Sequence, residues 1–264
     1  MQLKRKVYYR LSPWARFFVR RIYYLPIDIW ESLTNKRYKY EPPKGLIYTG
    51  SGNFLAQGTR HLDLLKKYIK LKPDDAVLDV GSGIGRTAIA LTDFMTKEGN
   101  YEGFDVVKKG VDWCNKKIKK DFPNFNFKYV PLKNDLYNKK NDKAENFTFP
   151  YGNNSFDKVF LFSVFTHMSV EEIAHYLCEI KRVLKPEGLC LSTIFIYNNK
   201  IENDISKGIY HSFPIKKGNY RLMSNNVKSA NIALNEDLLN GLIKKAQLEK
   251  LKTIEGSWKY DKSN

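Results

Sequence analysis

The sequence predicts an α/β fold in which helices flank a central, mostly parallel sheet. Short apolar segments typical of buried strands alternate with longer segments whose apolar residues recur at helical spacing. The strand-like segments lie at 76–80, 101–107, 125–132, within 155–168, at the end of 170–196 and at 248–256. The helical segments lie at 61–71, 87–95, 111–120, at the start of 170–196 and at 236–247. This alternation is typical of βαβ units, whose strands run parallel.

The most informative segment is VLDVGSGIGR at 77–86, which joins a strand to a helix through three glycines. Glycines at 81, 83 and 85 let backbone N–H groups approach an extended polar ligand, and the helix N-terminus favours negative charge there. A dinucleotide fingerprint, G-x-G-x-x-G, needs its third glycine where Arg86 stands. The spacing therefore disfavours a dinucleotide pyrophosphate.

Asp79 precedes Gly81 by two residues, and D-x-G-x-G at a strand end resembles motif I of the class I S-adenosylmethionine (SAM) methyltransferases. Asp105 at the next strand end and YLCEIKRVLKPEG at 176–188 extend the resemblance, which covers roughly residues 46–256. It implies a Rossmann-like class I methyltransferase fold, with SAM as cofactor and S-adenosylhomocysteine as product. The overall pattern is also similar to bacterial methyltransferases of glycans and small molecules.

The resemblance also implies which residues contact SAM. An acidic residue at Asp105 can accept two hydrogen bonds from ribose hydroxyls. In members of the family, residues at the position of Asn134 to Leu136 commonly contact the adenine. Tyr48 to Gly50 are candidate lid contacts over the cofactor, or else they form an ordinary linker. The expected cofactor-binding residues are Tyr48, Thr49, Gly50, Asp79, Gly81, Ser82, Gly83, Gly85, Phe104, Asp105, Val106, Asn134, Asp135, Leu136, Ser163 and Val164.

The chain divides into a basic, aromatic-rich helical arm at 1–45 and a methyltransferase domain at 46–264. Residues 1–40 hold ten Lys or Arg against two acidic residues, and the whole chain has a formal net charge of +17. Such an excess indicates an anionic partner or surface. We expect a helix to begin at Ser12-Pro13, and Pro26 to end or kink it before a second short helix at 27–33.

Three interpretations of this arm remain open. Trp14, Phe17, Phe18 and Ile22 mark one helix face, and Arg16 and Arg20 mark another. The aromatic face either packs on the catalytic domain, with solvated arginines, or lies on an anionic membrane surface. Nucleic acid is the third option, disfavoured as a base-methylation substrate because no (Asn/Asp)-Pro-Pro-aromatic motif follows the fourth strand.

Residues 197–235 form an insertion after the fifth strand and lack sustained periodicity. A loop of this length is usually functional or disordered, and it leaves the sheet on the ligand side. The insertion is a candidate substrate cover that presents Tyr210, His211, Tyr220 and Arg221 to a polar acceptor. The alternative is a surface loop without a role in binding. After the sixth strand at 248–256, the remaining residues are too short and polar for the family's seventh strand.

Histidines are the candidate general bases, since methylation of a hydroxyl requires loss of its proton. His167 follows the fourth strand at the expected site mouth, and His211 lies in the candidate cover, so both are predicted catalytic residues. His61 and His175 lie in helical segments and are expected to be structural or surface groups. We expect no metal site, because Ser163 to Met168 contain none of the aspartates that metal-dependent relatives carry there.

Together these features predict a metal-independent O-methyltransferase of a saccharide or lipid-linked polar acceptor. The alternatives are an N-methyltransferase of a small amine and a non-catalytic SAM-binding protein that grips an anionic partner. Three cysteines without a CxxC pair and the lack of a signal core or spanning segment favour the cytoplasm, with peripheral contact at an anionic membrane as a further option.

Overall fold

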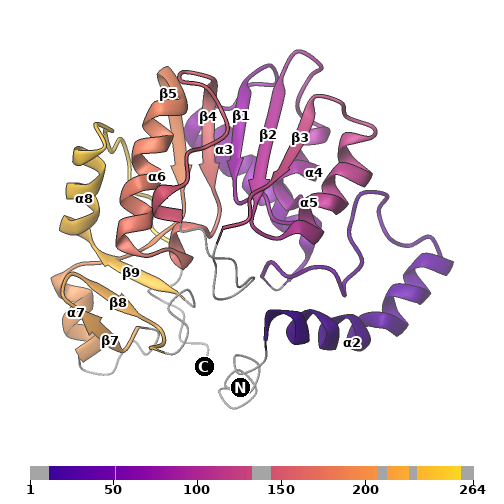
Figure 1. Ribbon diagram of the computed structural model, residues 1–264, viewed down its shortest axis with the longest axis horizontal. Helices are drawn as coiled ribbons and strands as arrows, with labels where there is room; N and C mark the ends of the chain where they lie inside the picture. Colours follow the sequence, from indigo (N-terminus) through magenta and orange to yellow (C-terminus); the bar gives the residue numbers. More distant parts are fainter. Residues whose placement is uncertain (1–11, 51, 133–143, 207–212, 226–230, 257–264) are drawn as a thin grey trace.

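The computed structural model describes residues 12–50, 52–132, 144–206, 213–225 and 231–256, and its centre is a parallel five-stranded sheet (Figure 1). The strands are β1 (Ala76–Val80), β2 (Asn100–Asp105), β3 (Phe125–Tyr129), β4 (Phe156–Leu161) and β5 (Leu184–Ser192). Their order is β3-β2-β1-β4-β5, and each neighbouring pair is parallel. The order reverses beside β1, which places the ligand crevice at the carboxyl ends of β1 and its neighbours. The predicted fold class is confirmed.

Helices cover both faces of this sheet, because alternate strand residues are apolar on opposite sides. The helices are α3 (Phe54–Ile69), α4 (Arg86–Thr92), α5 (Lys108–Cys114), α6 (Val170–Val183) and α8 (Glu236–Lys245), and a π-helical turn, Asn115–Lys119, extends α5. In β1, Val77 belongs to the buried cluster that includes residues of α3, α4 and α5. Leu78 and Val80 belong to the opposite cluster, with residues of α6 and α8.

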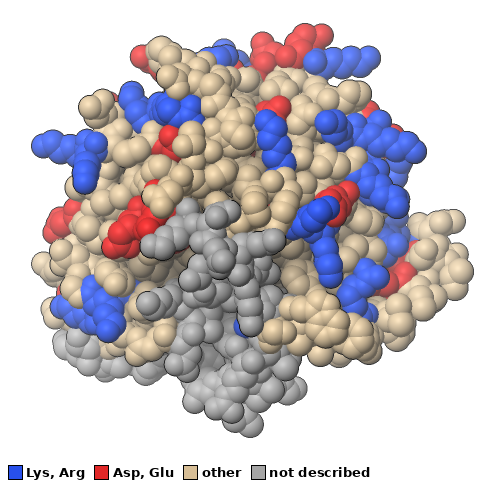
Figure 2. All heavy atoms as spheres, viewed as in Figure 1, with Lys and Arg blue, Asp and Glu red and all other residues tan. Residues whose placement is uncertain are grey.

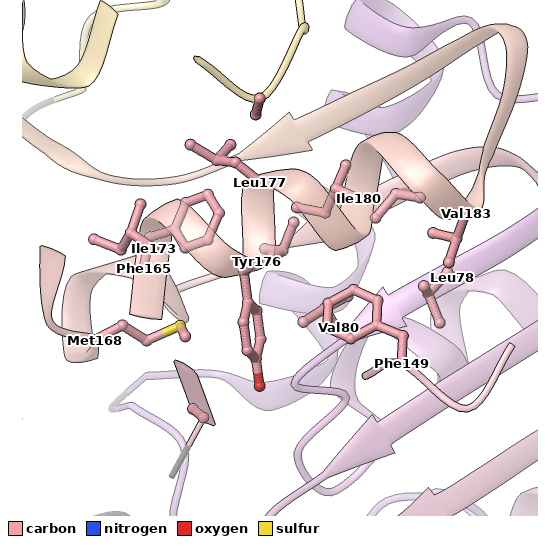
Figure 3. Close-up of a cluster of buried hydrophobic side chains, with 14 of the residues drawn as sticks. Leu78, Val80, Phe149, Phe165, Met168, Ile173, Tyr176, Leu177, Ile180 and Val183 are labelled. Carbon is pink, nitrogen blue, oxygen red and sulfur yellow. The ribbon is translucent and has the colours of Figure 1, made fainter. Parts of the chain in front are cut away.

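Local sequence determines where these helices begin and how closely they pack. Ser169 and Glu172 form a capping box at the start of α6, which satisfies two backbone N–H groups. From α6, Tyr176 packs edge to face on Phe149, with ring centroids 5.0 Å apart (Figure 3). Between α3 and α4, a Cβ at Gly58 would lie 2.5 Å from the backbone oxygen of Arg86. Glycine at this position therefore allows the two helices to approach each other.

The insertion after β5 forms a second, small sheet, so the expectation of an aperiodic loop is wrong. Its strands are β6 (Phe195–Tyr197), β7 (Ile215–Lys217), β8 (Tyr220–Leu222) and β9 (Ile232–Asn235), in the order β6-β9-β8-β7, and α7 (Asn199–Ser206) packs beside them. Tyr197, Ile201 and Phe213 belong to its buried apolar cluster. Strands of three or four residues are too short to show an alternating pattern in sequence.

The predicted sixth strand at 248–256 is also wrong, because residues 249–256 form no helix or strand and are exposed. Its apolar residues recur every third position, at Leu248, Leu251 and Ile254, and this spacing matches neither face of a strand. Within the described residues, β5 therefore has a neighbour on one side only.

The basic arm forms one helix, α2 (Pro13–Leu33), which Ser12 caps by accepting a hydrogen bond from the Ala15 amide at 3.2 Å. Helical structure continues through Pro26, so the separate helix at 27–33 is wrong, although the helix bends along its length (Figure 1). Pro26 explains the bend, since proline removes a backbone donor inside a helix. None of the described helices combines the length and the apolar character that crossing a bilayer requires.

Candidate functional site

A cavity of about 230 Å³ lies at the carboxyl ends of the central strands. Its walls come from the segment before α3, the turn after β1, the end of β2, the segment after β4 and the first half of α6. Of the predicted cofactor-binding residues, those that line it are Tyr48, Thr49, Gly50, Gly81, Gly83, Phe104, Asp105, Val106, Ser163 and Val164. Asn134, Asp135, Leu136 and His211 lie outside the described residues.

The turn after β1 depends on glycine for its path. Gly81, Gly83 and Gly85 have φ values of 78°, 61° and 84°, in the left-handed region that side chains with a Cβ rarely adopt. A Cβ at Gly81 would also lie 2.5 Å from the Val164 side chain. Glycine at these positions therefore lets the backbone of the turn itself form part of the cavity wall. Gly85 does not line the cavity but packs against Ile118 and the Cys114 thiol.

Asp105 ends β2 with its carboxylate on the cavity wall. One oxygen accepts a hydrogen bond from the Gly83 amide at 2.9 Å, and the other accepts from the Val107 amide at 2.8 Å and from the Tyr48 hydroxyl at 3.4 Å. Burial raises the pKa of Asp105 to about 6, although these hydrogen bonds oppose the rise. The carboxylate thus connects the glycine turn, the end of β2 and the segment before α3 that contains Tyr48.

Asp79 and Ser82 are buried beside the turn rather than on the cavity wall. Asp79 accepts a hydrogen bond from the Tyr101 hydroxyl at 2.7 Å. Burial raises the pKa of Asp79 to about 7, and the charge of Asp105 raises it further. Asp79 therefore links β1 to β2 through Tyr101, and a direct contact with SAM stays a prediction.

Arg86, at the start of α4, is a cavity residue that the sequence did not single out for binding. Its guanidinium donates a hydrogen bond to the Thr49 backbone oxygen and lies 5.1 Å from the centre of the Phe54 ring. The Nε atom is buried and has no hydrogen-bond partner among the described residues, and the same holds for the Thr49 hydroxyl. Burial lowers the pKa of Arg86, but a guanidinium stays charged in proteins. This end of the cavity therefore suits an anionic or acceptor-rich group.

His61 also lines the cavity, whereas the sequence indicated a structural or surface role. Its ring stacks on Phe162 with centroids 3.7 Å apart, and its Nδ1 atom lies 2.8 Å from the Thr87 hydroxyl. Burial lowers the pKa of His61 to about 4, and the positive charge of Arg86 adds to the effect. His61 is therefore neutral at physiological pH and fixed in orientation.

His167 lies where the sequence predicts, in a short 3-10 turn after β4, and it lines the cavity. Glu172 and Tyr176 of α6 line the same cavity. His175 faces elsewhere and places its Nε2 atom 2.9 Å from the Phe147 backbone oxygen, which agrees with a structural role.

The candidate cover does not bring its arginine to this cavity. Arg221 is buried in the small sheet, where it donates a hydrogen bond to the Phe213 backbone oxygen at 3.1 Å and pairs with Glu202. Tyr220 packs with the apolar cluster beneath the sheet, and neither residue lines the cavity. Arg221 therefore stabilises the insertion itself, and Tyr220 packs the insertion against the core of the main sheet. Tyr210 lies outside the described residues.

The pKa of Asp105 predicts that SAM binding weakens in acid. Only the carboxylate form can accept hydrogen bonds from both ribose hydroxyls, so affinity should fall as the pH drops through about 6, approaching tenfold per pH unit below it. Calorimetry between about pH 7.5 and pH 5 measures this. In an Asp105→Asn variant, SAM affinity should no longer change with pH in this way. Any remaining change of affinity with pH would be assigned to the protonation of Asp79. A wild-type affinity that is flat over this range would contradict the prediction.

A parallel sheet ordered β3-β2-β1-β4-β5, a glycine turn after β1 and an acid at the end of β2 on one cavity define the fold and site of class I SAM-dependent methyltransferases. Residues 78–192 match the family model described as a methyltransferase domain. The order of the sheet and the lining of the cavity agree with the class I SAM-dependent fold of such a domain.

One curated methyltransferase is similar to the chain in sequence, and one solved structure is similar to it in fold alone. The chain is 32% identical over 161 residues to the demethylmenaquinone methyltransferase of Lactobacillus johnsonii, a match that covers 61% of this chain and 58% of that protein. The match therefore spans less than two thirds of the curated relative. A crystal structure of a Pyrococcus horikoshii protein is similar in fold, with a TM-score of 0.50 and 17% identity, covering 76% of this chain and 84% of that one.

Proposed function

We propose that this protein transfers the methyl group of SAM to a hydroxyl group of a lipid-linked polar acceptor, without a metal ion. The observation that carries the proposal is that one cavity joins the glycine turn and Asp105 to His167. The first two address a nucleoside cofactor, and the histidine supplies a base for a hydroxyl acceptor.

The cavity residues fit the three parts of SAM. A carboxylate offers about four acceptor sites, and the amides of Gly83 and Val107 occupy two of those of Asp105. Two ribose hydroxyls fit the remaining sites if they replace the long 3.4 Å hydrogen bond from the Tyr48 hydroxyl. Phe104 and Leu132 offer apolar surface beside Asp105, as an adenine ring requires. The positively charged Arg86, which lines the cavity beside Thr49, suits the carboxylate of the methionine part.

Bound SAM supplies a methyl group already activated by its positively charged sulfur. The chain's own residues then position the acceptor and remove its proton, and positioning alone can lower the barrier by roughly 7–11 kcal/mol. A general base works best with a pKa near the operating pH. His61, with a pKa of about 4, is a weak base, so we assign proton removal to His167 and orientation to His61.

A lipid-linked acceptor has more support than a free saccharide. The curated relative is named for demethylmenaquinone, a quinone, and the cavity wall of this chain includes Phe162, Val164 and Met168. No group of three His, Cys, Asp or Glu that could hold a metal occurs among the described residues. Metal independence stays a prediction.

Isotope-labelled SAM and a panel of acceptors test the proposal. The panel contains reduced demethylmenaquinone, polyprenyl-linked sugars, free sugars and small amines, and mass spectrometry identifies the atom that gains the label. We expect the labelled methyl group on an oxygen atom of a lipid-linked compound. A labelled methyl group on a ring carbon of demethylmenaquinone would contradict the hydroxyl acceptor. Label on an amine nitrogen would assign the rival N-methyltransferase activity. SAM binding without transfer to any member would favour the non-catalytic alternative.

A further inference from the structure

The outer face of α2 is apolar and exposed. We define this face by six residues whose exposed fractions lie between 50% and 79%: Trp14, Phe18, Ile22, Leu25, Ile29 and Leu33. The helix holds ten of the thirteen large hydrophobic residues that are exposed in the described part of the chain. Single exposed apolar side chains are normal, but a contiguous face of this kind marks an interaction site.

The inner face of the same helix is charged, which reverses the usual arrangement of a surface helix. Arg16 is buried, and Arg20 donates a hydrogen bond through Nε to the Lys44 backbone oxygen at 3.2 Å. Asp28 accepts hydrogen bonds from the Lys44 and Gly45 amides at 2.7 and 3.0 Å. These polar contacts hold α2 to residues 44–45 with its apolar face turned outward. Of the residues predicted to form the aromatic face, Trp14, Phe18 and Ile22 are therefore exposed, whereas Phe17 is half-buried and packs on Tyr48.

Charge favours an anionic bilayer over a second copy of this chain as the covering partner. Residues 1–40 hold ten basic and two acidic residues, and two copies would bring together net charges of +17 each. Arg21 and Lys36 are exposed on the described arm, and the Lys36 ammonium lies 4.4 Å from the centre of the Trp30 ring. In Figure 2 the surface at α2 is mostly uncharged and is bordered by basic side chains. Apolar surface with a basic border suits anionic head groups above acyl chains.

The helix also lies close to the cavity. It is placed on the side of the molecule where the central strands end (Figure 1). Phe17, on the inner side of α2, packs edge to face on Tyr48 with ring centroids 5.6 Å apart, and Tyr48 lines the cavity. Phe17 and Tyr48 therefore lie between α2 and the cavity, so a surface bound to the outer face of α2 would lie near the cavity.

We infer that α2 is an interfacial helix that docks this protein on an anionic lipid bilayer through its apolar outer face. The inference concerns binding to the bilayer and holds whatever atom the enzyme methylates. It also gives a lipid-linked acceptor a short path from the bilayer to the cavity.

Vesicle co-sedimentation tests the inference with the full chain. We expect binding to vesicles of phosphatidylglycerol and phosphatidylcholine, weaker binding to phosphatidylcholine alone, and partial release by salt. The triple variant Phe18→Ser/Ile22→Ser/Ile29→Ser should bind at least about tenfold more weakly. The matched control Leu251→Ser/Ile254→Ser removes exposed apolar residues outside the arm and should bind like wild type. Unchanged SAM affinity shows that each variant is folded.

Two results would overturn the inference. Wild-type protein that ignores anionic vesicles would remove the bilayer as partner. Sedimentation equilibrium showing a dimer that only the triple variant disperses, without vesicle binding, would assign the face to a second copy. Because neither readout involves methyl transfer, failure here is distinguishable from failure of the proposed reaction.

Discussion

Replacing Asp105 with Ala is expected to weaken SAM binding about 10–150-fold, as measured by calorimetry. Hydrogen bonds to a charged group contribute about 1.5–3 kcal/mol, and each 1.4 kcal/mol corresponds to about tenfold in affinity. The same change removes the acceptor that holds the Gly83 and Val107 amides, so it also loosens the turn. Both effects act in the same direction.

Asp112→Ala is the matched control for this variant. Asp112 lies in the following helix, is largely exposed and pairs with Lys108 at 2.7 Å, so its loss should leave SAM affinity unchanged. Asp105→Asn preserves shape but loses acceptor capacity, and it should fall between Ala and wild type. If Asp105→Ala bound SAM as tightly as wild type while remaining folded in thermal unfolding, the ribose assignment would fail.

The central sheet was predictable because its signals are local. Strand β1, the glycine turn and α4 follow one another within 76–92, and the apolar pattern of each is complete in that short stretch. The end of β2 at Asp105 could be placed for the same reason. In a parallel sheet, carboxyl ends share one edge, so the order of strands along the chain was enough to bring these residues to one cavity.

Features that the sequence alone could not place depend on tertiary contacts. Periodicity gives α2 two faces but does not say which one faces the domain, and the contacts of Asp28 with residues 44–45 decide it. His61 reaches the cavity because its ring stacks on Phe162, about a hundred residues away along the chain. Arg86 carried a sequence signal, since it follows the last glycine of the turn, but that position only served to disfavour a dinucleotide.

Replacing His167 with Ala is expected to lower turnover about 10²–10⁴-fold while SAM affinity stays nearly unchanged. The imidazole lines the cavity after β4, and the acceptor hydroxyl must lose its proton during attack. Wild-type turnover should therefore rise with pH, because only an unprotonated imidazole can accept the proton of the hydroxyl. Single-turnover kinetics with labelled SAM and the acceptor identified by the panel measure the loss of the chemical step separately from binding.

His175→Ala is the matched control, because His175 contacts the Phe147 backbone oxygen outside the cavity and should leave the chemical step intact. His61→Ala tests the division of roles between the two cavity histidines. Since His61 is held by Phe162 and Thr87 and is a weak base, its loss should disturb acceptor binding more than the pH profile. A His167→Ala variant that keeps the wild-type pH dependence, or loses less than about tenfold in turnover, would remove the base assignment and favour an acceptor that needs no proton transfer.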